Sequence, residues 1–337
     1  MFRCLGLLLV VGGGALVIGA CAELKQSRPL LPMKEYERMI VGRLDAEYVG
    51  TDNCVKKCHA HDRITHDFLH SVHGEQITHE TGLPLVNCES CHGPGSLAIA
   101  GLPDDPELND REKKKCDTTK LLDFKNLPPQ AQSLICLKCH SAASIPAIAL
   151  WNASAHALND VSCSDCHVLH QGPQQKVSQE QMAELCYGCH PEVKAANNLF
   201  SHHPLREKKM ACSDCHDAHG SQQDKLLRGI TPKDTCIRCH MEKQGPFVFE
   251  HADVTENCAN CHAAHGSVNN NLLTAAMPFL CLQCHSGHTL QNTDAVSGLP
   301  APQIKQLFVN RCTDCHSQVH GSDIPFPGIT RPGTLRQ

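Results

Sequence analysis

The chain has 337 residues and a formal net charge of −5 at pH 7, and only 4% of its residues are aromatic. This acidic balance excludes a nucleic-acid-binding protein, which needs a basic patch, and the shortage of large aromatic side chains argues against an ordinary globular core. Cysteine and histidine are abundant instead, with 23 and 24 residues. Nearly every cysteine lies close to another, and a histidine directly follows the second cysteine of each pair, which a disulfide framework does not require.

Residues 1–21 have the pattern of a signal peptide with a lipobox. Met1-Phe2-Arg3 is a short basic start, and an apolar run continues to Ala20, as in a secretion signal. Ile18-Gly19-Ala20-Cys21 resembles a bacterial lipobox, so we expect Cys21 to become the lipidated N-terminus. The alternative is ordinary cleavage nearby, with Cys21 incidental. Residues 22–48 are interpreted as a tether, and no later apolar run reaches the ~20 residues of a spanning helix.

Nine copies of Cys-x-x-Cys-His follow, and this is the attachment signature of c-type haem. The two thiols add to the porphyrin vinyl groups, and the next residue places an imidazole under the iron. Zinc sites pair one CxxC with a second CxxC or a histidine pair, without a histidine after each one. The motifs therefore predict covalent haem c. They are Cys88-Cys91-His92, Cys136-Cys139-His140, Cys163-Cys166-His167, Cys186-Cys189-His190, Cys212-Cys215-His216, Cys236-Cys239-His240, Cys258-Cys261-His262, Cys281-Cys284-His285 and Cys312-Cys315-His316.

A tenth motif, the first in the chain, is one residue longer: Cys54-Val55-Lys56-Lys57-Cys58-His59. One extra residue can bulge without moving the sulfurs out of reach, so we count it as haem 1 and expect ten haems per chain. Among the other cysteines, Cys4 goes with the signal and Cys21 with the lipobox. Cys116 has no partner in the sequence pattern and no following histidine, and is interpreted as a buried or idle thiol.

The histidines outside the motifs keep a regular phase against them. His170, His219, His265 and His288 each come three residues after a proximal histidine, and His320 comes four after one. Another group lies upstream of a motif, at His156, His203 and His251. These phases indicate distal iron ligands, and therefore low-potential, six-coordinate bis-His haems. They leave open which histidine serves which iron, because a distal histidine in a packed array often ligates a neighbouring haem.

The same phases define a repeat. An upstream histidine, a CxxCHxxH motif and a plain CxxCH occur in turn at 156–190, 203–240 and 251–285. At this haem density the haems form the core. We expect a multihaem cytochrome fold: short α-helices and loops wrapped around a chain of haems, elongated, with almost no β structure, and dependent on haem for folding.

Four segments resemble one known family. They are "NCESCHGPGS" (87–96), "MACSDCHDAHGS" (210–221), "HADVTENCANCHAAHGSVNN" (251–270) and "CTDCHSQVHGS" (312–322). They are similar to the decahaem c-type cytochromes of outer-membrane electron conduits (the MtrA/DmsE type), over about residues 50–325. The resemblance implies two pentahaem modules, here 49–200 and 201–337. By matching position it implies these distal ligands: His73, His156, His170, His203, His219, His251, His265, His288 and His320.

Three features depart from that family. The first motif is stretched, and the N-terminus carries a lipobox rather than a simple cleaved signal. The family also has a distal histidine shortly after "CHGPGS", where this chain has Ala98. The tenth distal ligand must then be another histidine of the first half: His61 or His79 are the leading candidates, ahead of His66 and His70.

The resemblance implies an electron carrier rather than an enzyme. We expect a haem wire between the periplasm and the cell surface in extracellular respiration, lipid-anchored at the outer membrane and partly inside a β-barrel porin. Expected partners are that porin, an extracellular multihaem cytochrome, and periplasmic or inner-membrane cytochromes as electron donors. The alternatives are a periplasmic shuttle, an extracellular filament cytochrome and, less favoured, a multihaem reductase. The absence of a CxxCK motif disfavours the reductase.

Overall fold

The computed structural model describes residues 7–11, 14–18, 30–60, 62–76, 80–81, 85–105, 107, 115–170, 179–251, 256–285, 311–314 and 316–324. Its α-helices are α1 (Met33–Met39), α2 (Thr51–Cys58), α3 (Arg63–Leu69), α4 (Cys88–His92), α6 (Pro129–Leu137), α7 (Ala155–Leu158), α8 (Cys163–Cys166), α9 (Gln179–Tyr187), α10 (Pro191–Asn197), α11 (Cys212–Cys215), α12 (Pro232–Ile237) and α14 (Phe279–Leu282). Short 3₁₀ turns lie between them: Thr118–Lys120, Phe124–Asn126, Pro146–Ile148, Trp151–Ala153, Asp224–Leu226, Met241–Lys243, Cys258–Asn260, Asn270–Leu272 and Cys312–Asp314.

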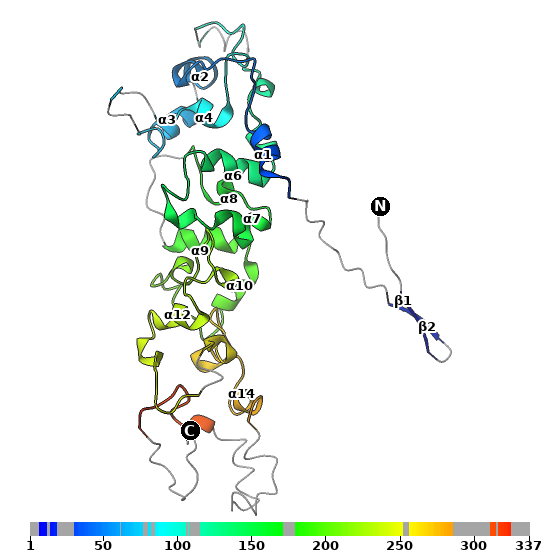
Figure 1. Ribbon diagram of the computed structural model, residues 1–337, viewed down its shortest axis with the longest axis vertical. Helices are drawn as coiled ribbons and strands as arrows, with labels where there is room; N and C mark the ends of the chain where they lie inside the picture. Colours follow the sequence, from blue (N-terminus) through cyan, green and yellow to red (C-terminus); the bar gives the residue numbers. More distant parts are fainter. Residues whose placement is uncertain are drawn as a thin grey trace, which may run out of the picture.

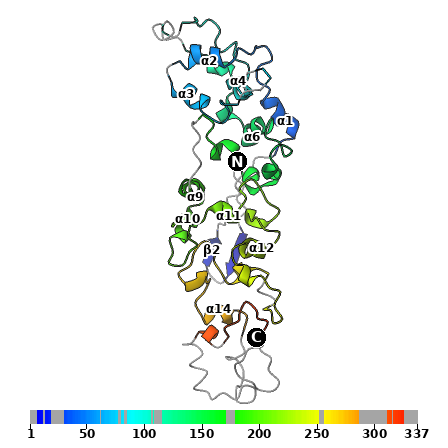
Figure 2. The ribbon, with the colours of Figure 1, turned by 90° about the vertical axis from the view of Figure 1, so that its left-hand side faces the viewer.

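These elements form a long, narrow column. Helices α2, α3 and α4 lie at one end and α14 lies near the other, with α6, α9, α10 and α12 between them in chain order and α1 beside α6 (Figure 1). The view at right angles shows the same elongated shape (Figure 2). No helix of the described residues exceeds nine residues, so the elongation comes from stacking many short elements.

The described residues contain two strands, β1 (Leu7–Val11) and β2 (Gly14–Ile18). They pair antiparallel, with Leu7 opposite Ile18 and Val11 opposite Gly14. Both lie inside the predicted signal peptide, and the haem-motif region is built of helices, turns and isolated bridges. The expected fold, helices and loops with almost no β structure, is confirmed.

The polypeptide packs little apolar surface against itself. One small cluster joins α1 to α6 through Tyr36, Ile40, Ala131 and Ile135. Only nine hydrophobic residues of the described chain are buried, and four of these are alanines. A core of this size is far too small for a chain of this length, so the interior must be completed by something other than side chains.

Acidic side chains start several of the short helices within the motifs. The carboxylate of Asp165 accepts a hydrogen bond from the backbone of Ser162 at 2.7 Å, and Asp214 accepts one from Ala211 at 2.8 Å. Asp234 repeats the contact at 2.7 Å in α12. Each carboxylate satisfies a free N–H at a helix start, as in a capping box. In α8 and α11 this acidic residue comes directly before the second cysteine, so it helps to fix the turn of the motif.

Glu89 ties the first two motifs together. It is 3% exposed, and its carboxylate accepts hydrogen bonds from the backbone N–H groups of Val49, Gly50 and Gly95 at 2.8–2.9 Å. A side chain on Gly95 would meet Val49 at 3.2 Å and Glu89 at 3.3 Å. The glycine of "CHGPGS" therefore allows the close approach that lets one buried carboxylate hold α2 beside α4.

Candidate functional site

A single backbone hydrogen bond shapes most of the ten motifs, numbered 1 to 10 in chain order. In motifs 3 to 10 the N–H of the motif histidine donates to the carbonyl of the first cysteine, at 2.8–3.0 Å. This i→i−4 bond closes one helical turn. Residues three and four apart share a helix face, so one turn presents both thiols and the imidazole to the same side, as covalent haem requires.

Motif 1 keeps this turn despite its extra residue. The N–H of His59 donates to the carbonyl of Cys54 at 3.2 Å, an i→i−5 contact, and to that of Val55 at 3.0 Å. Such a widened turn is a known way to insert one residue into a helix. The N–H of His59 is therefore shared between two carbonyls, and one turn at the end of α2 still holds Cys54 and His59 together.

One continuous channel of about 5900 Å³ runs through the molecule and is lined by cysteines and histidines of every motif. Shared among ten motifs, this volume gives each about 590 Å³, within the roughly 300–1,000 Å³ of a cofactor site. The channel lies where an ordinary protein would have its core. Covalent haem would fill it and complete the interior.

Along this channel the motif histidines face histidines from other parts of the chain. In motifs 2, 4, 6 and 8, the motif histidine faces the distal histidine that comes just after the next even-numbered motif. The ring centroids are 5.9–6.2 Å apart, with interplanar angles of 9–28°. The pairs are His92–His170, His167–His219, His216–His265 and His262–His320.

The odd-numbered motifs 3, 5, 7 and 9 are paired in the opposite direction. Each motif histidine faces the histidine that lies upstream of the preceding motif. The centroids are 5.7–6.4 Å apart, with steeper interplanar angles of 31–70°. The pairs are His140–His73, His190–His156, His240–His203 and His285–His251.

These separations fit a metal ion between the two rings. Two metal–nitrogen bonds of roughly 2.0–2.1 Å, plus ~1.1 Å from each nitrogen to its ring centre, give about 6.2–6.4 Å. In the described part of the chain, no group of three or more His, Cys, Asp or Glu residues is arranged to hold a metal ion. A bis-His site of this kind would leave the remaining positions of an iron to the four nitrogens of a haem.

The upstream histidines are oriented by the backbone of the next repeat. Nδ1 of His156 lies 3.0 Å from the carbonyl oxygen of Ala218, and Nδ1 of His203 lies 2.7 Å from that of Ala264. His251 makes the same contact with Val319 at 3.1 Å. A metal-binding histidine commonly donates its second ring N–H in this way, which fixes its tautomer and leaves Nε2 for the metal.

Burial keeps several paired imidazoles neutral. Desolvation lowers the pKa of His92, His167 and His73 below the usual histidine value. It also lowers the pKa of His265 and His320. Burial disfavours the charged imidazolium, and the neutral ring is the form that binds metal.

The motif thiols also meet in a fixed order. The first cysteines of motifs 1 and 2, 3 and 4, 5 and 6, 7 and 8, and 9 and 10 lie close enough to raise or lower each other's pKa: Cys54–Cys88, Cys136–Cys163, Cys186–Cys212, Cys236–Cys258 and Cys281–Cys312. The second cysteine of each even motif lies near that of the next odd motif: Cys91–Cys139, Cys166–Cys189, Cys215–Cys239 and Cys261–Cys284. The attachment points therefore form one unbroken series.

Cys58 departs from the expectation that it bonds haem. Its sulfur forms a disulfide with Cys116, with the Cα atoms 5.9 Å apart. A disulfide sulfur cannot also form a thioether, so this pairing differs from the expectation that Cys58 bonds haem and that Cys116 is a buried or idle thiol. The sequence pattern gave no sign of this pairing, because 58 residues separate the two cysteines.

Ala98, where the resembling family has a histidine, is 3% exposed. It lines the channel, and its carbonyl accepts a hydrogen bond from the N–H of Asp117 at 2.9 Å. Of the proposed substitutes, the rings of His66 on α3 and of His70 directly after α3 face each other with centroids 4.3 Å apart, and neither residue lines the channel. His61, His79, His288, Cys315 and Cys21 lie outside the described residues, so their roles stay predictions.

The glycine after three distal histidines has a packing role that the sequence patterns alone did not reveal. A Cβ on Gly220 would lie 2.7 Å from the carbonyl oxygen of Leu150, and one on Gly321 would lie 2.5 Å from the Phe247 ring. A Cβ on Gly266 would overlap the carbonyl of Ala196. The recurring "HGS" therefore lets each distal histidine approach an earlier segment. The repetition of "HGS" in the sequence could have pointed to this packing role.

Comparison with known proteins agrees with this geometry. A family model described as "Doubled CXXCH motif" matches residues 156–195, 202–245 and 251–289, which confirms the three repeats. A second, "Cytochrome c554 and c-prime", matches residues 107–168. The multihaem cytochrome MtrA of Shewanella baltica (strain OS185) is 36% identical over 280 residues, covering 82% of this chain and 79% of its own. The chain belongs to the MtrA family of multihaem c-type cytochromes. Its CXXCH motifs are sites of covalently bound haem c, and its activity is electron transfer.

Proposed function

We propose that this MtrA-family chain is a decahaem wire in which paired histidines hold each iron. The observation that carries the proposal is the series of eight imidazole pairs along one channel, each at the spacing of a bis-His metal site. Bound haem supplies reversible one-electron chemistry of iron. The polypeptide fixes the order and ligation of the haems, and two histidine ligands leave no open position for a substrate.

The same pairing rule leaves the two end motifs of the array without a distal histidine at the regular position. Under this rule, the iron of an even-numbered motif takes its distal histidine from just after the next even-numbered motif. The iron of an odd-numbered motif takes its distal histidine from the segment before the preceding motif. Motif 1 has no preceding motif, and motif 10 has none after it. We assign His288 to motif 10, because it is the remaining predicted distal histidine, and His61 or His79 to motif 1. A histidine at position 98 would follow motif 2 and would serve no haem under this rule.

Low-temperature EPR of the purified holoprotein tests the ligation. Six-coordinate bis-His haems are low-spin, so we expect low-spin ferric signals from all or nearly all haems. Intact mass measured on the same sample should show ten haem additions. A majority of high-spin ferric haem, or fewer than nine haems, would contradict the proposed wire.

We further propose that the wire works at the outer membrane inside a β-barrel porin, and passes electrons between periplasmic or inner-membrane cytochromes and an extracellular multihaem cytochrome. No helix of the described residues is long and apolar enough to span a bilayer. Irregular backbone is tolerated at membrane depth only where protein covers it, and large barrels have polar lumens. A loop-rich column would therefore need such a sheath to cross hydrocarbon.

Gentle detergent extraction followed by pull-down on the cytochrome tests the sheath. We expect a barrel protein in stoichiometric amount. The matched control is the same pull-down after extraction in a denaturing detergent, which should release the barrel. Recovery of the cytochrome alone under gentle conditions would favour a periplasmic shuttle over a sheathed conduit.

A further inference from the structure

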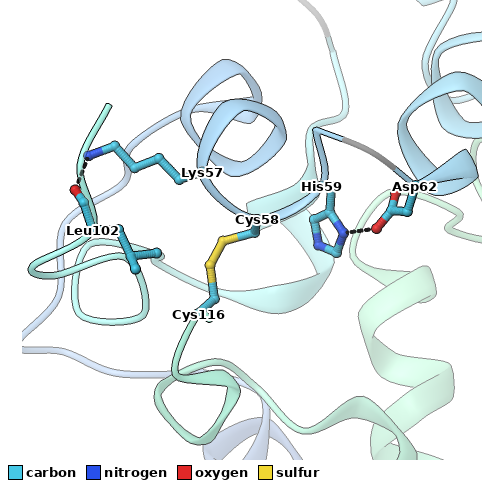
Figure 3. The surroundings of a disulfide bond; sticks show 6 residues. All are labelled: Lys57, Cys58, His59, Asp62, Leu102 and Cys116. Atoms are coloured by element: carbon cyan, nitrogen blue, oxygen red, sulfur yellow. Dashed lines mark hydrogen bonds and ion pairs between the residues drawn. A yellow bond between two sulfur atoms is a disulfide. The ribbon is translucent and has the colours of Figure 1, made fainter. Parts of the chain in front are cut away.

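The first haem motif ends at a disulfide. Cys58 is the last residue of α2, and Cys116 lies just before the turn at Thr118–Lys120. Figure 3 shows the bond between their sulfurs below the end of α2, with His59 turned away from it toward Asp62. Both cysteines are half-buried. The second cysteine of motif 1 is therefore engaged on the side away from the motif histidine.

Cys54, by contrast, keeps the position of a regular haem cysteine. Its thiol lies close enough to that of Cys88 to perturb its pKa, as the first cysteines of the other four motif pairs do with theirs. The N–H of His59 reaches the carbonyl of Cys54 at 3.2 Å and that of Val55 at 3.0 Å. Cys54 and His59 are thus held on one turn, while the sulfur of Cys58 is engaged by Cys116.

Cys116 takes a place that is otherwise held by a motif cysteine. In motifs 3, 5, 7 and 9 the second cysteine lies near the second cysteine of the preceding motif. Motif 1 has no preceding motif. The neighbour of Cys58 is Cys116 instead, so a non-motif cysteine completes the series at the end of the column.

The segment around Cys116 is fastened to α2 and α4 by contacts independent of the sulfurs. The ammonium of Lys57 donates to the carbonyl of Leu102 at 3.3 Å and pairs with Asp104 at 2.9 Å. The N–H of Asp117 donates to Ala98, and that of Leu122 donates to His92, both at 2.9 Å. Cys116 is therefore held near Cys58 by the fold.

We propose that haem 1 is attached by a single thioether, to Cys54, and that Cys58 and Cys116 form a structural disulfide that closes the end of the array. The S–H of Cys54 adds across one vinyl group: a sulfur–carbon bond forms, the proton goes to the other vinyl carbon, and the second vinyl group stays intact. The thiols of Cys58 and Cys116 lose two protons and two electrons. The acceptor is the disulfide of an oxidising thiol–disulfide exchange protein, which becomes a dithiol.

Peptide mapping of the wild-type holoprotein decides the proposal without any variant. Free thiols are blocked by alkylation, and the protein is digested without reductant. We expect the peptide with Cys54 to carry one haem and to be linked to the peptide with Cys116, and reduction should release the latter. A haem bonded to both Cys54 and Cys58, together with an alkylated Cys116, would overturn the proposal.

Three variants sharpen the result. Cys58→Ser should keep ten haems and convert Cys116 into an alkylatable thiol, whereas Cys54→Ser should lose one haem. Cys116→Ser should keep ten haems and free Cys58. If Cys58→Ser loses a haem while Cys116→Ser retains all ten, Cys58 is an attachment residue and the proposal fails. Since the readouts are haem mass and cross-linking, they do not depend on electron transfer.

Discussion

The neighbouring residues His202 and His203 give a sharp test of the ring pairing. The ring of His203 faces His240 with centroids 6.4 Å apart. His202 instead uses both ring nitrogens within the protein: Nδ1 lies 2.7 Å from the carbonyl oxygen of Leu199, and Nε2 lies 3.2 Å from the carboxylate of Glu207. Under the proposed ligation His203 is therefore an iron ligand, and His202 is its matched control.

The variant His203→Ala removes one distal ligand. One of the ten haems should become five-coordinate and high-spin, so the low-spin signal should fall by about a tenth. The lost hydrogen bond to Ala264 adds a stability cost of about 1 kcal/mol. His202→Ala should leave the low-spin signal unchanged. It should also raise the pKa of Glu207, because the hydrogen bond from His202 holds that pKa below its usual value.

Magnetic circular dichroism of both variants, normalised to total haem, measures the spin change. If His202→Ala produces the high-spin haem and His203→Ala does not, the ring pairing is wrong. Equal high-spin content in both variants would show general loosening of the haem pocket instead of loss of one ligand, and would refute the assignment in the same way.

Three further predictions follow from single contacts. Gly266→Ala should lower the stability of the holoprotein by about 2–4 kcal/mol in denaturant titration, through overlap and backbone strain; Gly101→Ala, which has open space around its Cβ, should cost clearly less. Glu242→Gln should raise the potential of one haem in a spectroelectrochemical titration, because the Glu242 carboxylate lies 3.6 Å from Nδ1 of His240 and makes that ligand more basic. Cys21→Ser should abolish palmitate labelling and membrane association, whereas Cys4→Ser should change neither.

The sequence predicted the haem motifs, the helix-and-loop fold and the repeats, because each depends on local spacing. A CxxCH turn closes within five residues, so neighbouring residues in the sequence determine its geometry. The regular phases of residues such as His170 and His251 likewise marked candidate ligands. The pairing of the histidines could not be predicted from the sequence. His170 faces His92 and His251 faces His285 only because separate segments of the chain stack in the fold.

Long-range contacts account for what the sequence patterns missed. The pairing of Cys58 with Cys116 depends on the docking of a distant segment through Lys57 and Ala98, and no local pattern encodes it. The choice between His202 and His203 similarly depends on which ring nitrogens the surrounding backbone engages. In each case the deciding group is a backbone carbonyl or a carboxylate brought in by the fold.

Electron transfer across a sealed membrane tests the central claim most directly. Liposomes that enclose an electron-accepting dye are reconstituted with the holoprotein and its candidate barrel protein, and a membrane-impermeant reductant is added outside. The account predicts reduction of the enclosed dye when both proteins are present, and none with the barrel alone or the cytochrome alone. An intact complex that inserts fully but leaves the dye oxidised would contradict the claim that this chain is an electron wire.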